Sequence, residues 1–126
     1  MKIKKLYLLT ALAFHVAIAQ AQEKLVALSF DDGPNTTTTV HMLDVLKKHQ
    51  VKASFFVIGK NITPESAKIM VRAQKEGHDI ENHSLTHSPM SQLSADSIRS
   101  EVKATSVLVK KYTGKAPVFS VHLILM

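Results

Sequence analysis

The chain has 126 residues, no cysteine and a formal net charge of +6 at pH 7. Without cysteine it has no disulfide and no thiolate ligand, so any bound metal is held by histidine and carboxylate. Three of its 16 lysines and arginines lie in residues 1–21, which leaves 13 basic and 10 acidic residues in the remainder. This small surplus, without a basic stripe interleaved with aromatic residues, argues against nucleic acid as a partner.

Residues 1–21 have the pattern of a secretory signal peptide. Three lysines begin the segment, an apolar stretch follows, and small residues end it at Ala19 and Ala21. The apolar stretch is shorter than the roughly 20 residues that span a bilayer, which favours a cleaved signal over an uncleaved anchor. We therefore expect export to the periplasm, the cell envelope or the medium, with residues 22–126 as one domain or part of one.

Short apolar runs then alternate with helical patterns along the chain. The expected elements are, in order, a strand at 24–30, a helix at 37–49, a strand at 53–58, a helix from Thr63 to Gly77, a strand at 78–80 and a helix from Ser94 to Gly114. Thr63 precedes a proline and Ser94 precedes an apolar stripe, as N-caps do, and the two glycines are typical helix ends. The alternation predicts an α/β fold whose buried parallel strands carry the chemistry at their carboxyl ends.

Two of these strand ends hold residue types that bind metals. Asp31 and Asp32 follow the first expected strand, and His83 and His87, in the segment HSLTH, follow the third. Two histidines and one carboxylate are a standard ligand set of Zn²⁺ hydrolases, which keep a further position for water. Neighbouring residues leaving a strand point to opposite sides, so one aspartate can bind the metal while the other acts as a base. The alternatives are exposed loop histidines and turn-forming aspartates.

Residues 29–34, SFDDGP, resemble the first signature of the polysaccharide deacetylases, the NodB-homology domain of carbohydrate esterase family 4, and residues 83–87 resemble the second. The resemblance implies that Asp31 is the catalytic base and that Asp32, His83 and His87 are the metal ligands. It also implies that residues 22–126 form the N-terminal part of a distorted (β/α) barrel.

The activity that the resemblance implies is metal-dependent removal of N-acetyl or O-acetyl groups from a sugar polymer such as peptidoglycan, chitin-type oligomers or xylan. The expected partner is therefore an acetylated polysaccharide, and no protein partner is expected. Zn²⁺ suits two histidines and an aspartate, and Co²⁺, Ni²⁺ and Fe²⁺ compete for such ligands.

The later motifs of the family are missing from this sequence. The third, an arginine followed by prolines and a tyrosine, orients the base, and the fifth supplies a histidine as general acid. Residues 119–126 stand where the third motif begins, and they can be encoded by a string that reads Phe-Arg-Pro-Pro-Tyr-Phe-Asn two bases later. We therefore expect a shifted reading frame here, which sequencing the gene tests, and we do not assign His122 as the general acid.

For the chain as written we expect an incomplete barrel, a third strand with an unpaired edge, and slight turnover. The alternative function is a non-catalytic metal- or carbohydrate-binding protein. A metal phosphoesterase is disfavoured because the sequence lacks a Gly-rich phosphate loop and an arginine cluster. A further histidine, His78, lies outside both signatures and is expected near the site.

Overall fold

A computed structural model describes residues 24–121, so the expected signal peptide and His122 lie outside the described residues. The elements are β1 (Ser29–Gly33), α2 (Thr38–His49), β2 (Ser54–Val57), η1 (Gly59–Asn61), α3 (Pro64–Lys75), β3 (Asp79–Asn82), η2 (Met90–Gln92) and α4 (Ala95–Thr113). Among these residues no helix is long and apolar enough to cross a membrane. The alternation of strands and helices predicted from the sequence is confirmed.

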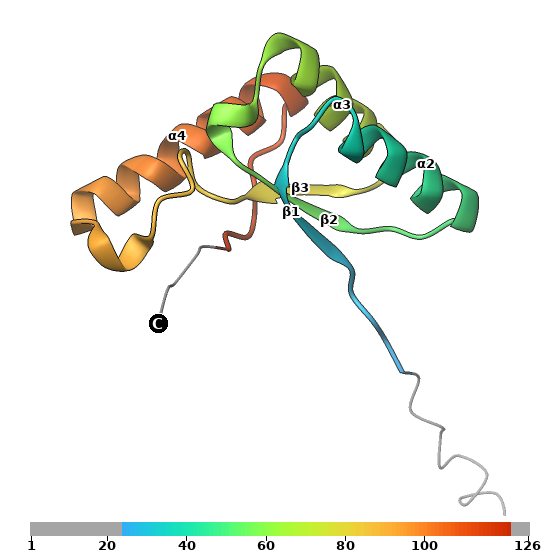
Figure 1. The fold of residues 1–126 in the computed structure, drawn as a ribbon, viewed down its shortest axis with the longest axis horizontal. Helices are drawn as coiled ribbons and strands as arrows, with labels where there is room; N and C mark the ends of the chain where they lie inside the picture. Colours follow the sequence, from blue (N-terminus) through green and yellow to red (C-terminus); the bar gives the residue numbers. More distant parts are fainter. Residues whose placement is uncertain (1–23, 122–126) are drawn as a thin grey trace, which may run out of the picture.

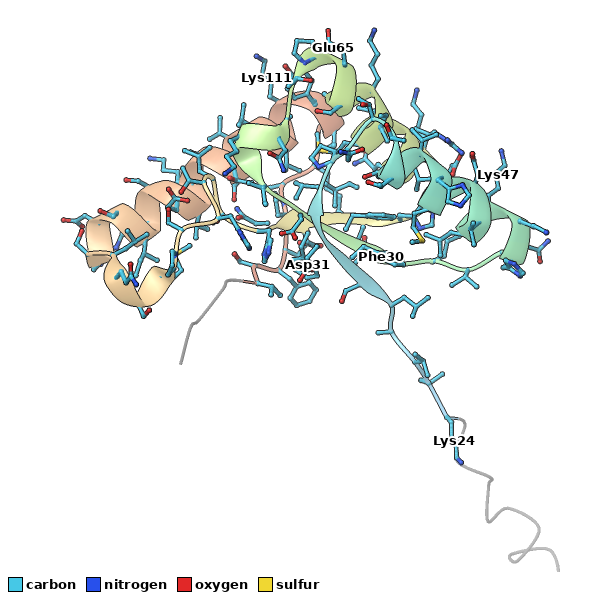
Figure 2. All side chains as sticks on the ribbon, in the orientation of Figure 1. Lys24, Phe30, Asp31, Lys47, Glu65 and Lys111 are labelled. Atoms are coloured by element: carbon cyan, nitrogen blue, oxygen red, sulfur yellow. The ribbon has the colours of Figure 1, made fainter. Side chains whose placement is uncertain are left out.

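The three strands form a parallel sheet in the order β1-β2-β3, and α2, α3 and α4 lie along one side of it (Figure 1). Phe55 in the central strand pairs with Phe30 and with Ile80, and the two phenylalanine rings stack with their centroids 5.4 Å apart. The largest fully buried apolar side chains come from all three helices and β2: Leu43, Val57, Met70 and Val109. Charged side chains such as Lys47, Glu65 and Lys111 project from the helices (Figure 2).

The boundaries of α3 and α4 follow the caps predicted from the sequence. The hydroxyl of Thr63 accepts the backbone N–H of Ser66, and the hydroxyl of Ser66 accepts the backbone N–H of Thr63. Ser94 caps α4 by accepting the N–H of Ser97 at 3.2 Å. Gly114 ends α4 with a φ of 77°, a conformation that glycine adopts without a steric penalty.

The first strand begins later than the sequence predicts. We expect a buried strand over residues 24–30, but β1 starts at Ser29, and Leu25 and Val26 are 87% and 84% exposed. The ladder with β2 starts where the N–H of Ser54 donates to the carbonyl of Leu28, and β2 has no residue upstream of Ser54 to continue it. At its other end β1 extends through both aspartates and finishes at Gly33.

The expectation that β3 has an unpaired edge is also wrong at the carboxyl end of this strand. The N–H of Asn82 donates to the carbonyl of Phe119 (3.2 Å), and the N–H of Val121 donates to the carbonyl of Asn82 (3.0 Å). The chain leaves α4 and returns beside β3, where it satisfies backbone groups that would otherwise lack partners. This return segment, residues 118–121, brings a distant part of the chain to the end of the sheet that carries the predicted ligands.

Candidate metal centre

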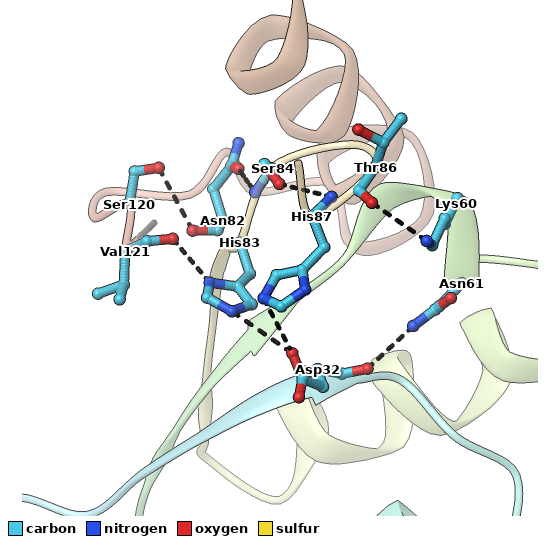
Figure 3. Close-up of polar contacts among 10 residues, drawn as sticks. All are labelled: Asp32, Lys60, Asn61, Asn82, His83, Ser84, Thr86, His87, Ser120 and Val121. Atoms are coloured by element: carbon cyan, nitrogen blue, oxygen red, sulfur yellow. Dashed lines mark hydrogen bonds and ion pairs between the residues drawn. The ribbon is translucent and has the colours of Figure 1, made fainter. Parts of the chain in front are cut away.

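Three side chains meet at the carboxyl ends of β1 and β3 (Figure 3). The Oδ1 atom of Asp32 lies 3.5 Å from Nε2 of His83 and 3.5 Å from Nε2 of His87, and one ligand atom from each residue lies within 4.8 Å of the others. Ligand atoms bound at roughly 2.0–2.1 Å to a tetrahedral ion are about 3.3 Å apart. The two aspartate–histidine separations therefore fit a small divalent cation held between the three groups.

The ring of His83 is fixed in one tautomer. Its side chain is only 5% exposed, and Nδ1 lies 2.7 Å from the backbone carbonyl oxygen of Val121. Because a carbonyl can only accept, Nδ1 carries a proton, and Nε2 is the ring nitrogen that faces Asp32 and can offer a lone pair to a cation. A lone pair and a carboxylate oxygen repel each other unless a cation or a proton lies between them. A backbone carbonyl behind a histidine is a common way to orient a metal ligand.

Two of the three residues have left-handed backbone conformations, with φ values of 69° for Asp32 and 62° for His87. Such conformations cost about 1–3 kcal/mol each in residues other than glycine and persist where neighbours enforce them. The side chain of Asn61 donates to the carbonyl of Asp32 (2.9 Å), and the hydroxyl of Ser84 accepts the N–H of His87 (3.0 Å). These contacts hold both side chains in their positions facing His83.

The centre opens to solvent on the side of Asp32. The side chains of Asp32 and His87 are 67% and 31% exposed, in contrast to buried His83. A polar hollow beside Asp32 is lined by residues that include Asn35, Lys60 and Asn61. Catalytic metal sites differ from structural ones in keeping one accessible position, and this arrangement has that property.

Asp31 is adjacent to the centre but is not part of the group of three. It is exposed, and it lines a second hollow together with Phe30, Thr39 and Phe55. Because β1 is irregular between Phe30 and Gly33, the alternation of a regular strand does not set the directions of the two carboxylates. Its role as the base therefore stays a prediction.

His78 lies at the opposite end of β3, so the expectation that it is near the site is wrong. Its Nδ1 accepts the N–H of Ala53 (3.2 Å), and its ring packs edge-on against Phe55. Burial lowers the pKa of His78, and the positive charge of Lys52 lowers it further. This histidine is part of the core.

Asn82 positions the segment that carries the two histidines, and sequence reasoning does not identify it. Asn82 donates through Nδ2 to the carbonyl of Val102 (2.7 Å) and to the hydroxyl of Ser106 (2.9 Å), while its Oδ1 accepts the N–H of Ser84 (2.8 Å). It thus ties the end of β3 to α4. Its place directly before His83 is the only signal in the sequence that points to it.

A parallel sheet with helices along one side, and with an aspartate and two histidines at its strand ends, is part of a barrel-type α/β domain with a candidate metal centre. The chain belongs to the polysaccharide deacetylase family, which matches residues 19–121. Its fold resembles a family 4 acetyl xylan esterase from Clostridium thermocellum, solved in complex with a cobalt ion, at 43% identity and a TM-score of 0.75. That match covers 77% of this chain and 47% of the esterase chain.

Among curated proteins, a bifunctional xylanase/deacetylase of Pseudobutyrivibrio xylanivorans is 42% identical over 92 residues, which are 73% of this chain and 15% of that protein. A peptidoglycan-N-acetylglucosamine deacetylase of Bacillus cereus is 39% identical over 94 residues, 75% of this chain and 34% of the relative. This chain therefore spans about half of the matched esterase chain and 15% and 34% of these curated relatives. The family and the α/β barrel-type fold inferred from the two signatures are confirmed.

Proposed function

We propose that this chain binds a divalent cation through Asp32, His83 and His87 and hydrolyses acetyl groups on a polysaccharide. The observation that carries the proposal is the convergence of one carboxylate oxygen and two imidazole nitrogens, with the aspartate 3.5 Å from each histidine. The names of the relatives, a xylanase/deacetylase and a peptidoglycan deacetylase, support the class of substrate.

Zn²⁺ is the cation we propose first, because two histidines and a carboxylate at these separations suit a tetrahedral ion. The cobalt ion in the related esterase supports a divalent transition metal in this family. Ni²⁺ and Fe²⁺ are alternatives, because they also bind imidazole and carboxylate ligands. When bound, such a cation supplies Lewis acidity toward the acetyl carbonyl and lowers the pKa of a coordinated water.

The residues of the chain have separate tasks in this proposal. Buried His83 and its carbonyl partner fix one side of the centre, while exposed Asp32 leaves the other side accessible to the polymer. Asp31 accepts a proton from the attacking water, which adds to the acetyl carbon. The polar hollow that Asn35 and Lys60 help to line lies where sugar hydroxyls would bind. The bond from the acetyl carbon to the sugar nitrogen or oxygen then breaks, and the leaving atom takes up the proton that Asp31 accepted. Acetate and the freed amine or hydroxyl are the products.

A polymeric cell-wall substrate requires the protein outside the cytoplasm. The pattern of residues 1–21 supports export to the periplasm, the cell envelope or the medium. We therefore propose that the chain acts on peptidoglycan, chitin-type oligomers or xylan in one of these locations.

The second candidate is a metal- or carbohydrate-binding protein without the reaction. One observation favours it: the arginine and histidine motifs that the resemblance assigns to orienting the base and protonating the leaving group are not in the sequence. On this basis we propose that turnover by this chain is slow.

Acetate release separates the two candidates. The chain is loaded with Zn²⁺ or Co²⁺ and incubated with acetylated xylan, chitin oligomers and peptidoglycan fragments. Deacetylation predicts acetate release that ends when a chelator is added and is lost in Asp31→Asn while metal binding persists. Metal binding and oligosaccharide binding without acetate support the non-catalytic candidate.

A further inference from the structure

Residues 84–86 join the two histidine ligands, and each of their backbone carbonyls accepts a hydrogen bond from η1. The N–H of Gly59 donates to the carbonyl of Ser84 and the N–H of Lys60 to that of Leu85, both at 2.9 Å. The ammonium group of Lys60 donates to the carbonyl of Thr86 at 3.1 Å (Figure 3). We call residues 84–86 the histidine linker, because its shape sets the relative positions of the two imidazoles.

The N–H groups of the linker are bonded to one carboxylate on α4. Oε2 of Glu101 accepts the N–H of Leu85 (2.9 Å) and the N–H of Thr86 (2.8 Å), and Oε1 accepts the hydroxyl of Thr86 (2.9 Å). Hydrogen bonds to an ionised acceptor are about twice as strong as neutral ones. Glu101, which lies 14 residues beyond His87, thus accepts three hydrogen bonds from Leu85 and Thr86.

We propose that Glu101 is a positioning residue for the metal centre, acting through the histidine linker. The linker begins at Ser84 and is followed by His87, and their φ values of 67° and 62° lie in the left-handed region that is unfavourable for both residues. Without the carboxylate, the amides of Leu85 and Thr86 lose their partners and the turn relaxes toward ordinary conformations. The distance between the two imidazoles is then no longer fixed at the value the cation requires.

The core of the fold does not depend on the same contacts. α4 packs through Thr105 and Val109, which are 0% and 1% exposed, whereas Glu101 is only partly buried. The hydrogen bonds given above for Glu101 all end on the linker. Its replacement should therefore change the metal centre more than the overall fold.

The inference rests on the proposed metal site, and three variants test it by separating placement from charge. Glu101→Ala removes the carboxylate, and Glu101→Asp keeps the charge but shortens the side chain by one methylene, so it no longer reaches both amides. Glu101→Gln keeps an oxygen for the amides and offers an N–H₂ group to the hydroxyl of Thr86. Asp96→Ala is the control, because Asp96 lies on the same helix and its carboxylate, 94% exposed, pairs with Arg99.

Two readouts are measured on the full chain: the Kd for Co²⁺, from the visible absorption of the bound ion, and amide exchange of the metal-free protein. Glu101→Ala and Glu101→Asp should raise the Kd about 10–100-fold, the usual cost of losing an outer partner of a metal site. Both should accelerate exchange at Leu85 and Thr86. Glu101→Gln should lose less affinity than Glu101→Ala, because one oxygen still accepts from the amides, and Asp96→Ala should bind Co²⁺ as the unaltered chain does.

The inference is overturned if Glu101→Ala and Glu101→Asp bind with the unaltered Kd, or if Glu101→Gln loses as much affinity as Glu101→Ala. If Glu101→Ala lacks the helical circular dichroism signal, Glu101→Asp decides the question by the same criteria. If the unaltered chain binds no Co²⁺, the proposed metal site is wrong. Amide exchange then still tests the role of Glu101. If Leu85 and Thr86 exchange at the same rate in Glu101→Ala and Glu101→Asp as in the unaltered chain, that role is refuted.

Discussion

The imidazole of His83 donates from Nδ1 to the backbone carbonyl of Val121, 38 residues further along the chain and 2.7 Å away. This bond links the second signature to the segment that returns beside β3 after α4. It leaves Nε2 of His83 as the atom that faces Asp32. The return segment therefore affects the metal centre through its backbone, whatever side chain stands at position 121.

Removing the return segment should weaken metal binding. A chain that ends at residue 116 lacks the carbonyl that holds the tautomer of His83, and its Kd for Co²⁺ should rise about 10–100-fold. A chain that ends at His122 keeps Val121 in a peptide bond, with its backbone carbonyl, and serves as the control. Calorimetric titration compares the two, and equal affinities would show that the bond does not support the ligand.

Glu81 should be the main attachment point of the same segment. Its side chain is buried, and Oε2 accepts the N–H groups of Val118 and Phe119 at 2.8 and 2.7 Å. Glu81→Ala leaves both amides without this partner, so the free energy of unfolding should fall by about 1–3 kcal/mol. Glu81→Gln keeps one acceptor oxygen and should lose less. Urea unfolding measures both, and a neutral Glu81→Ala would contradict the attachment.

Gly59 should be intolerant of a methyl group. A Cβ at this position would lie 2.4 Å from the hydroxyl of Thr105 and 2.8 Å from Cδ1 of Leu85, so α4 or the histidine linker has to move. Gly59→Ala should lower the free energy of unfolding by about 1–3 kcal/mol. Gly33→Ala is the matched control, because its Cβ would meet only the hydroxyl of Thr39 at 3.5 Å. Similar stabilities of the two variants would argue against this crowding.

Stability should decline as the pH falls below about 6.5, in part through His78. Burial lowers the pKa of His78 in the folded chain, so the unfolded chain takes up the proton first and gains stability relative to the folded one. The loss should proceed from about pH 6.5 down to the lowered pKa. His78→Asn keeps an acceptor for the N–H of Ala53 but does not titrate, so its decline should be shallower. Urea unfolding at several pH values tests this, and identical slopes would exclude His78 as a source.

The sequence was sufficient to predict the helices and the proximity of Asp32, His83 and His87. Thr63 and Ser94 each accept a hydrogen bond from an amide three residues away, so the starts of their helices could be predicted from the local sequence alone. Asp32, His83 and His87 could be placed together because parallel strands bring their carboxyl ends to one edge.

Features that depend on distant partners could not be read in this way. The apolar residues Leu25 and Val26 match a buried strand, but the ladder needs a partner strand, and β2 starts too late to provide one. Glu101 has the same appearance in the sequence as any exposed acid on a helix. Its role follows only from the packing of α4 against the histidine linker.

Binding of Co²⁺ to the full chain and to two neighbouring aspartate variants is the most direct test of the account. The unaltered chain and Asp31→Asn should bind the ion with similar affinity and similar visible spectra. Asp32→Asn should lose more affinity than the about 10–100-fold expected for an outer partner, because it removes a ligand charge. Absence of binding by the unaltered chain, or loss in Asp31→Asn with retention in Asp32→Asn, would contradict the assignment of Asp32, His83 and His87 as the metal ligands.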